Sequence, residues 1–219
     1  RRQRQMCIRD RAGEHGHYGE KDGRFHLLDD LHTMNSLLHE RFPGLPIILY
    51  GHSMGSFLAR TYIIRHPEGL KGAIISGTGQ NPGIVVSSGK LMAKLEILDH
   101  GDKYPSPLLD KLAFGNYNKG YDKVRTNSDW LTRDEAIVDA FIADPLCGRI
   151  ATAGLFRDMM TGLQFIWKTE NLNKMNKAMP VYFFAGDKDP VGGNGENVKK
   201  VYNRFLKIGM QDVKLKLYK

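Results

Sequence analysis

The sequence predicts an α/β fold built on a mostly parallel sheet, and three observations support this prediction. Helix-like and strand-like segments alternate along residues 24–76. One apolar strand runs directly into the pattern Gly-His-Ser-Met-Gly at 51–55. The alternation stops for about a hundred residues and resumes after residue 178. Such alternation is typical of a parallel sheet flanked by helices.

The first core elements follow one another closely. Residues 24–42 carry apolar side chains at helical spacing, which predicts a helix with one buried stripe. The run LPIILY at 45–50 predicts a strand buried on both faces. A helix over 57–66 and a second buried strand at 73–76 follow. The stripe of the first helix consists of Leu27, Leu28, Leu31, Met34, Leu37 and Leu38.

Residues 81–178 predict a helical insertion, because helical patterns recur there without a convincing strand. One of these helices is preceded by Thr132 and Glu135 at the spacing of a capping box. The core then resumes with a strand from 179, a helix at 195–209 and a strand at 213–218. The core is therefore expected at 12–80 and 179–219. An insertion at this point is expected over the carboxyl ends of the strands, where ligands bind in open α/β sheets.

Composition limits the possible classes of protein. The 219 residues are 41% hydrophobic and 26% charged, which suits one globular domain. No stretch reaches the length of a membrane span. Half of the net charge of +8 comes from residues 1–11, so the remainder does not indicate a nucleic-acid partner. With only Cys7 and Cys147, a disulfide framework is not expected, which favours a reducing, cytoplasmic location.

Residues 1–11, RRQRQMCIRDR, are best explained as a non-native leader. Back-translation of MCIRDR resembles a transposase adapter from sequencing libraries. The alternative is a native basic arm for targeting or nucleic acid. A signal peptide is excluded because no apolar stretch follows the charges. Five arginines with few apolar residues are not expected to pack on the core.

The pattern GHSMG at 51–55 is typical of a nucleophile elbow, since a buried strand precedes it and a helix follows it. The sharp turn places Ser53 in a strained conformation, and Gly51 and Gly55 are expected to leave room for strand and helix to approach. The backbone N–H of Met54 lies at the start of the helix, where an oxyanion would be stabilised.

A serine nucleophile needs a base, and the base needs an acid to orient it. In this fold the acid comes from a loop after a later strand. FFAGDKDPV offers Asp187 and Asp189, and Asp189 is preferred because it lies past the strand end.

The base should follow the acid, but no histidine follows Asp189. His52 is expected to be a structural hydrogen-bonding residue, and His100 belongs to the insertion. His15 and His17 lack further ligands at metal-binding spacing, so no metal or cofactor is expected. The eight histidines are His15, His17, His26, His32, His39, His52, His66 and His100.

The segments ILYGHSMGSFLAR, SGTGQNPG, TRDEAIVDAFIADPLCG and MPVYFFAGDKDPVG resemble the monoacylglycerol lipase and lysophospholipase-like branch of the α/β-hydrolases, also grouped with serine aminopeptidases. The resemblance implies that Ser53 is the nucleophile, Asp189 the triad acid and Met54 an oxyanion donor. It implies acyl esters such as monoacylglycerols or lysophospholipids as substrates. An amide or peptide hydrolase and a non-catalytic binding homologue remain alternatives.

Three features of that family are absent from the sequence: an early His-Gly motif, the strands before the elbow strand, and the base histidine. The interpretation is a chain cut at both ends, which is expected to fold poorly alone and not to hydrolyse esters.

The insertion would then form a cap over the site. Its methionine and aromatic side chains suit a flexible acyl chain, although most are expected to pack cap helices together. The cap also offers a surface for transient contact with a membrane. The side chains are Met92, Leu95, Phe114, Tyr117, Trp130, Phe141, Phe156, Met159, Met160, Phe165 and Trp167.

Overall fold

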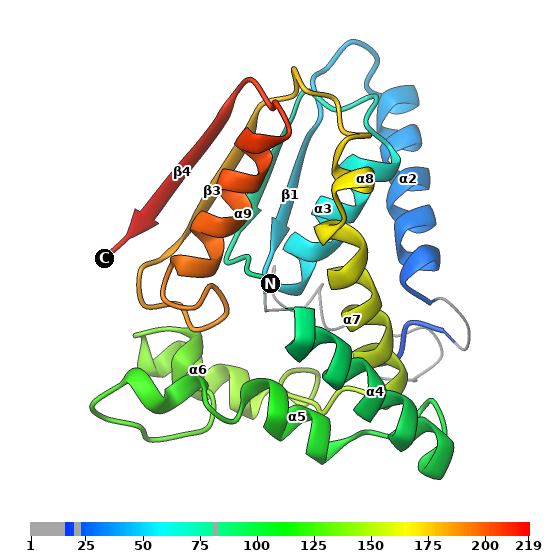
Figure 1. The fold of residues 1–219 in the computed structure, drawn as a ribbon. Coiled ribbons are helices and arrows are strands. Elements are labelled where there is room, and N and C mark those ends of the chain that lie inside the picture. The colour runs from blue at the N-terminus through cyan, green and yellow to red at the C-terminus, as the bar shows by residue number, and fades with distance from the viewer. Residues whose placement is uncertain (1–15, 20–22, 81–82) are drawn as a thin grey trace. The chain divides into compact units, whose positions relative to one another are not determined.

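The computed structural model describes residues 16–19, 23–80 and 83–219, and these form two compact units. Residues 24–86 and 159–219 form the sheet unit (Figure 1). Residues 87–158, with the described residues before 24, form the helical unit. The leader at 1–11 lies outside the described residues.

The sheet has four parallel strands in the order β1-β2-β3-β4, which confirms the predicted α/β class. At the carboxyl end of the sheet, Ser76 of β2 pairs with His52 of β1 on one side and with Phe184 of β3 on the other. The strands are β1 (Ile48–His52), β2 (Gly72–Ser76), β3 (Val181–Gly186) and β4 (Val213–Tyr218).

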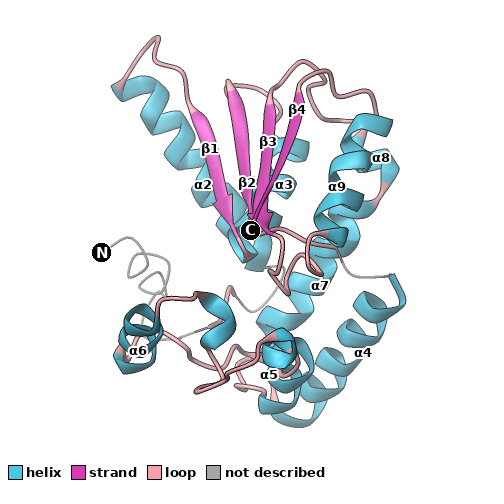
Figure 2. Cartoon of the chain, turned by 90° about the vertical axis from the view of Figure 1, so that its left-hand side faces the viewer, coloured by secondary structure: helices cyan, strands magenta, loops and turns pink. Residues whose placement is uncertain are grey.

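Helices cover one face of this sheet. α3 packs against β1 and β2, and α9 packs against β3 and β4; in Figure 2, α3 is seen behind the strands and α9 to the right of β4. Phe183 and Phe205 meet edge to face in the core, with ring centroids 5.0 Å apart. The helices of this unit are α2 (Gly23–Arg41), α3 (Met54–Arg65), α8 (Thr169–Leu172), α9 (Glu196–Lys207) and the second part of α7 (Ala153–Trp167).

The expectation that the first strand is buried on both faces is wrong for this chain. β1 is an edge strand, and Ile48 and Tyr50 are each 57% exposed. Only the residues that alternate with them, Leu49 and Gly51, turn toward α3 and the core. The apolar run therefore has one buried and one exposed face.

The stripe predicted for α2 is buried only at its beginning. Leu28 is fully buried, whereas Met34, Leu37 and Leu38 are exposed. The later part of α2 makes contacts through polar side chains, two histidines and Asn35, which bonds Tyr62. His32 Nδ1 lies 3.2 Å from the Tyr62 hydroxyl, and His39 Nε2 lies 2.8 Å from the carbonyl oxygen of Gly69. Because polar side chains occupy this contact, the leucines face outward.

The helical unit contains a partly buried ion-pair cluster. Arg157 bonds Asp102 at 2.6 Å and Asp158 at 2.9 Å. The aromatic rings of Phe114 and Trp130 stack with centroids 6.2 Å apart. The elements are α4 (Gly83–His100), α5 (Pro107–Phe114), two 3₁₀ helices (Tyr117–Gly120 and Asp129–Leu131), α6 (Glu135–Ala143) and the first part of α7.

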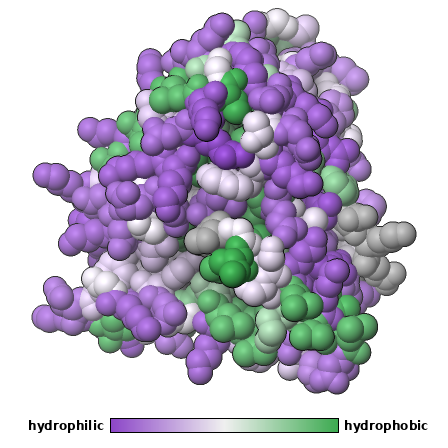
Figure 3. Space-filling view, in the orientation of Figure 1, coloured by the Kyte–Doolittle hydropathy of each residue, from purple (hydrophilic) through white to green (hydrophobic). Residues whose placement is uncertain are grey.

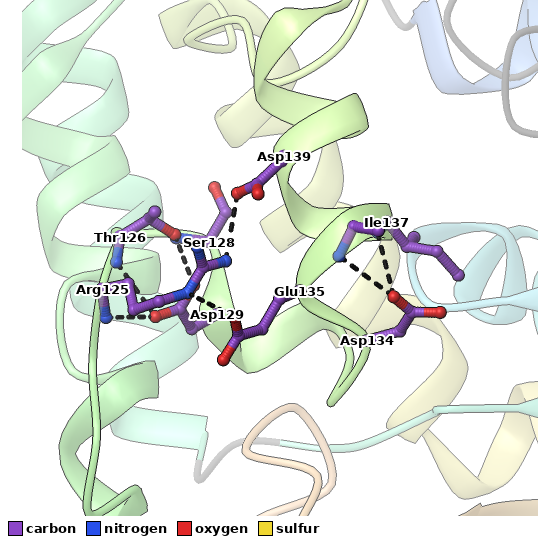
Figure 4. Close-up of polar contacts among 9 residues, drawn as sticks. Arg125, Thr126, Ser128, Asp129, Asp134, Glu135, Ile137 and Asp139 are labelled. Carbon is purple, nitrogen blue, oxygen red and sulfur yellow. Dashed lines mark hydrogen bonds and ion pairs between the residues drawn. The ribbon is translucent and has the colours of Figure 1, made fainter.

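The capping box predicted at Thr132 and Glu135 is wrong. The N-cap of α6 is Asp134, whose carboxylate accepts hydrogen bonds from the backbone N–H groups of Ala136 and Ile137 (Figure 4). Glu135 instead lies 3.6 Å from Arg125, which also pairs with Asp139 at 3.0 Å. A carboxylate two residues closer to the helix satisfies its first N–H groups better than a threonine.

The range 81–178 expected for the insertion stays a prediction, since the compact units describe contacts and not the bounds of a cap. The helical unit spans 87–158, because Leu163 and Ile166 of α7 belong to the core of the sheet unit. The segment at 16–19, expected with the core, groups instead with the helical unit: Gly16 O accepts hydrogen bonds from the backbone N–H and the hydroxyl of Thr152.

Candidate active site at the carboxyl end of the sheet

Ser53 occupies the turn between β1 and α3 in a conformation that non-glycine residues seldom adopt. Its φ is 50° and its ψ is −121°. Its side chain makes no capping hydrogen bond to α3, so the hydroxyl is not used by the helix. The backbone fixes the turn: Ser53 N–H donates to Ser76 O at 3.0 Å, and Ser56 N–H donates to Ser53 O at 2.8 Å. A non-glycine residue with positive φ between a strand and a helix is typical of a nucleophile elbow.

The two glycines of the motif contribute differently. A Cβ on Gly51 would collide with the carbonyl oxygen of Gly55 and would lie 2.7 Å from Ala59 Cβ. A Cβ on Gly55 would meet no described atom within 4 Å. The close approach of strand and helix therefore depends on the missing side chain at Gly51 alone, and the expectation that Gly55 also has to leave room is not supported.

Met54 is the first residue of α3. The first N–H groups of a helix point outward along its axis and carry the positive end of the helix dipole. This position is adjacent to the Ser53 hydroxyl in the chain, as an oxyanion donor requires.

Asp189 lies in the loop after β3 and is held by backbone groups. Its Oδ1 accepts a hydrogen bond from the N–H of Val191 at 2.9 Å. Burial raises the pKa of Asp189, while hydrogen bonds from the backbone of Val191 and Gly192 and the nearby His52 act in the opposite direction. Perturbed carboxylates of this kind cluster at functional sites, although structural networks produce them too.

Different contacts are described for the two candidate acids. Asp189 Oδ2 lies 3.3 Å from the point that a Cβ on Gly77 would occupy, and Gly77 follows β2. The backbone N–H of Asp187 instead donates to Tyr218 O of β4 at 2.7 Å. Since Ser53 is bonded to Ser76 at the end of β2, the Asp189 carboxylate lies beside the strand end that adjoins Ser53, and the preference for Asp189 over Asp187 stays a prediction.

His52 also belongs to this cluster, which sequence reasoning did not anticipate. Its ring lies 3.1 Å from the position that a Cβ on Gly77 would occupy, which is also the position near Asp189 Oδ2. Its Nδ1 lies 3.0 Å from the Ser76 hydroxyl. This hydrogen bond agrees with the structural role expected for His52. The proximity to Asp189 could be found only from the register, which sets His52 beside Ser76.

The other histidines considered earlier lie elsewhere or outside the description. His100 pairs with Asp99 at 3.1 Å in the helical unit. His17 Nδ1 lies 3.4 Å from the Thr152 hydroxyl, and His15 is not described. In the described ranges, no group of three or more His, Cys, Asp or Glu side chains is arranged to hold a metal ion. None of the helices in those ranges is long and apolar enough to cross a membrane.

The chain is similar in sequence to a known lipase and to a known esterase. A monoacylglycerol lipase of Mycolicibacterium smegmatis is 29% identical over 217 residues, which cover 93% of this chain and 66% of that protein. A thermostable carboxyl esterase of Bacillus coagulans, solved with glycerol, is 30% identical and superposes with a TM-score of 0.84 over 93% of this chain and 65% of its own.

A soluble variant of the monoglyceride lipase of Saccharomyces cerevisiae, solved with a substrate analogue, superposes with a TM-score of 0.63 at 20% identity and shares the fold. The superposition covers 94% of this chain and 63% of the yeast lipase chain. The chain thus spans just under two thirds of the length of these relatives. A family model described as serine aminopeptidase, S33, matches residues 9–219. On this match and on its parallel sheet, the chain belongs to the serine aminopeptidase S33 family of the α/β-hydrolases.

Proposed function

We propose that this chain derives from a serine hydrolase of carboxylic acyl esters in which Ser53 is the nucleophile, Asp189 the triad acid and Met54 N–H an oxyanion donor. The observation that carries the proposal is the strained backbone of Ser53 at the head of α3, with the Asp189 loop adjoining the next strand end. A fold alone hosts many activities, so the proposal depends on these side chains.

In the proposed reaction, Ser53 Oγ attacks the ester carbonyl carbon while its proton passes to an imidazole. The alcohol then leaves with that proton, and water releases the acid from the acyl-serine. Asp189 accepts a hydrogen bond from the imidazole and stabilises its charged form. His52 is the imidazole beside Asp189 in the described sheet unit, but its Nδ1 is already within bonding distance of Ser76. We therefore expect little turnover by the 219-residue chain without an added base.

Acyl esters with an apolar chain are the proposed substrates, such as monoacylglycerols or lysophospholipids. The named activities of the Mycolicibacterium and Saccharomyces relatives support this class. The helical unit offers apolar surface for such molecules, or for a lipid surface that holds them: leucines are exposed on α4 and α5, and Figure 3 shows apolar side chains gathered where these helices lie. These leucines are Leu91, Leu95, Leu98, Leu108 and Leu112.

A fluorophosphonate with a medium-length alkyl chain tests the nucleophile, because serine displaces fluoride once and no second step is needed. The chain is incubated with and without millimolar imidazole, and the adduct is located by peptide mass spectrometry. We expect slow labelling of Ser53, faster labelling with imidazole, and none in Ser53→Ala. Ser36→Ala is the matched control, since Ser36 is an exposed serine bonded only to His32 O of its own helix. A folded chain that is labelled elsewhere, or not at all with imidazole, contradicts the proposal.

Amide hydrolysis is the second candidate, and the description of the matching family favours it. A medium-chain nitrophenyl ester and an aminoacyl nitroanilide, assayed in parallel with imidazole, distinguish the two. Turnover that depends on Ser53 and is confined to the anilide would replace the ester proposal.

A further inference from the structure

Arg60 lies in the core of the sheet unit, two turns after Ser53 on α3. Its side chain is only 1% exposed, and burial lowers its pKa to about 9. No carboxylate of the described residues acts on it, and its Nε has no hydrogen-bond partner there. Burying a guanidinium without a counter-ion opposes folding, so the fold has to use this group in another way.

The guanidinium binds three consecutive residues of the segment that follows β2. Nη1 donates to Gly79 O at 2.9 Å and to the Thr78 hydroxyl at 3.3 Å, and Nη2 donates to Gln80 Oε1 at 3.4 Å. Thr78 and Gln80 are themselves buried. The segment is therefore fixed to α3 from inside the core.

This segment packs, backbone to backbone, against the loop that carries Asp189. A Cβ on Gly79 would collide with Val191 O, and a Cβ on Gly192 would lie 3.2 Å from Thr78 O. Val191 and Gly192 are the residues whose N–H groups hold the Asp189 carboxylate. A shift of residues 78–80 would therefore displace the groups that orient Asp189.

We propose that Arg60 is a positioning residue that sets the place of Asp189 relative to Ser53. The proposal rests on the hydrolase function proposed above. α3 carries Ser53 at its start and Arg60 two turns later, so the guanidinium links the helix of the nucleophile to the loop of the acid through residues 78–80. Neither reacting group touches Arg60, which acts only through this segment.

Arginine suits this position better than its common substitutes. Its planar fork presents several N–H donors in fixed directions, whereas a lysine ammonium is a point charge that cannot reach three acceptors on consecutive residues in the same way. An apolar residue of similar length removes the cost of the buried charge but leaves those acceptors without their donor.

The test uses the full 219-residue chain with Arg60→Lys and Arg60→Met, and with Arg65→Lys as the matched control. Arg65 lies on the same helix, is exposed, and stacks on the Phe25 ring at 4.4 Å. Two quantities are measured: amide hydrogen exchange by mass spectrometry, peptide by peptide, and the rate of Ser53 labelling by the fluorophosphonate with imidazole. Lysine retains the charge, so it is the milder variant if methionine prevents folding.

We expect both Arg60 variants to lose amide protection in two peptides, 77–80 and 187–193, while strands β1 and β4 keep theirs. Labelling of Ser53 should slow by roughly 10- to 100-fold, the cost of a displacement of about 1 Å in a reacting group. Arg65→Lys should change neither quantity. Unchanged protection at 187–193, or a uniform loss over the whole sheet, would overturn the inference. If the unmodified chain is never labelled, the proposed function fails, and the exchange data alone decide whether Arg60 positions the Asp189 loop.

Discussion

The carboxylate of Asp189 accepts a hydrogen bond from the backbone N–H of Val191 at 2.9 Å, yet burial raises its pKa above the usual 3.8. The native state therefore binds the Asp189 proton more tightly than the unfolded chain does. The contribution of this group to stability is complete below the usual pKa and is lost as the pH rises through the raised native value. At neutral pH, the ionised Asp189 opposes folding.

Asp189→Asn should accordingly melt at a higher temperature than the unmodified chain at pH 7, because the amide oxygen can still accept from Val191 without a buried charge. The gain should shrink as the pH falls toward 4. Calorimetry at several pH values measures it. Glu196→Gln is a control of opposite sign. A hydrogen bond from Lys199 at 2.8 Å lowers the pKa of Glu196, so removal of this carboxylate should not raise the melting temperature at pH 7. A lower melting temperature for Asp189→Asn at pH 7 would contradict the prediction.

Gly51→Ala should destabilise the sheet unit by about 1–3 kcal/mol, as overpacking does, since its Cβ would meet Gly55 O and Ala59. Gly55→Ala, on the same turn but with open space, should be neutral or stabilise by up to about 1 kcal/mol because alanine favours the helix. Denaturant unfolding compares the two. Equal costs at both positions would mean that the turn relaxes enough to accept either side chain.

His66 should make the stability depend on pH in the opposite direction to Asp189. Its ring stacks on His32 with centroids 4.1 Å apart and faces Tyr62. Burial lowers its pKa, electrostatic interactions with His32 and Arg65 lower it further, and Asp29 partly offsets this. Its contribution is therefore complete above the usual pKa of 6.5 and is lost as the pH falls through the lowered native value.

His66→Phe keeps the stacking but cannot titrate, so its melting temperature should fall less than that of the unmodified chain between pH 7.5 and 5.5. His26→Phe, at an exposed position of α2, serves as the control. If the melting temperatures of the unmodified chain and of His66→Phe fall in parallel with pH, His66 does not cause the pH dependence.

The exposed edge of β1 should make the purified chain self-associate. Ile48 and Tyr50 leave an apolar row beside unpaired backbone groups, which is the usual template for pairing with another chain. Introducing Ile48→Lys with Tyr50→Lys should shift the chain toward monomer in light scattering at tens of micromolar. Leu98→Lys, at an 83% exposed position of α4, should have a smaller effect. A monomeric unmodified chain at this concentration would disprove the prediction.

The sequence predicts those features that depend on local pattern. The strand over 213–218 is found at the predicted residues, and Ser53 heads its helix because the GHSMG pattern combines apolar strand, turn and helix. Features that depend on partners far along the chain were not predictable. Met34 and Leu37 have the same helical spacing as buried Leu28, yet only tertiary contacts decide that they stay exposed. Arg60 reads as an ordinary polar residue of an amphipathic helix, and nothing in the spacing indicates its buried contacts with residues 78–80.

The strand register also has a consequence for the order of folding. Residue pairs between β1 and β2, such as Ile48 with Gly72, are close in sequence, and so are those between β3 and β4. Ala73 and Val181, by contrast, pair across more than a hundred residues, so the β2–β3 contact carries the largest loop-closure entropy. Ser53 and Asp189 belong to different halves of the sheet on either side of this contact. We therefore expect two early βα halves that each lack a complete site, and a site that assembles only in the last and slowest step. Pulsed hydrogen exchange during refolding, with protection of β2 and β3 rising later than that of α3 and α9, would reveal this order.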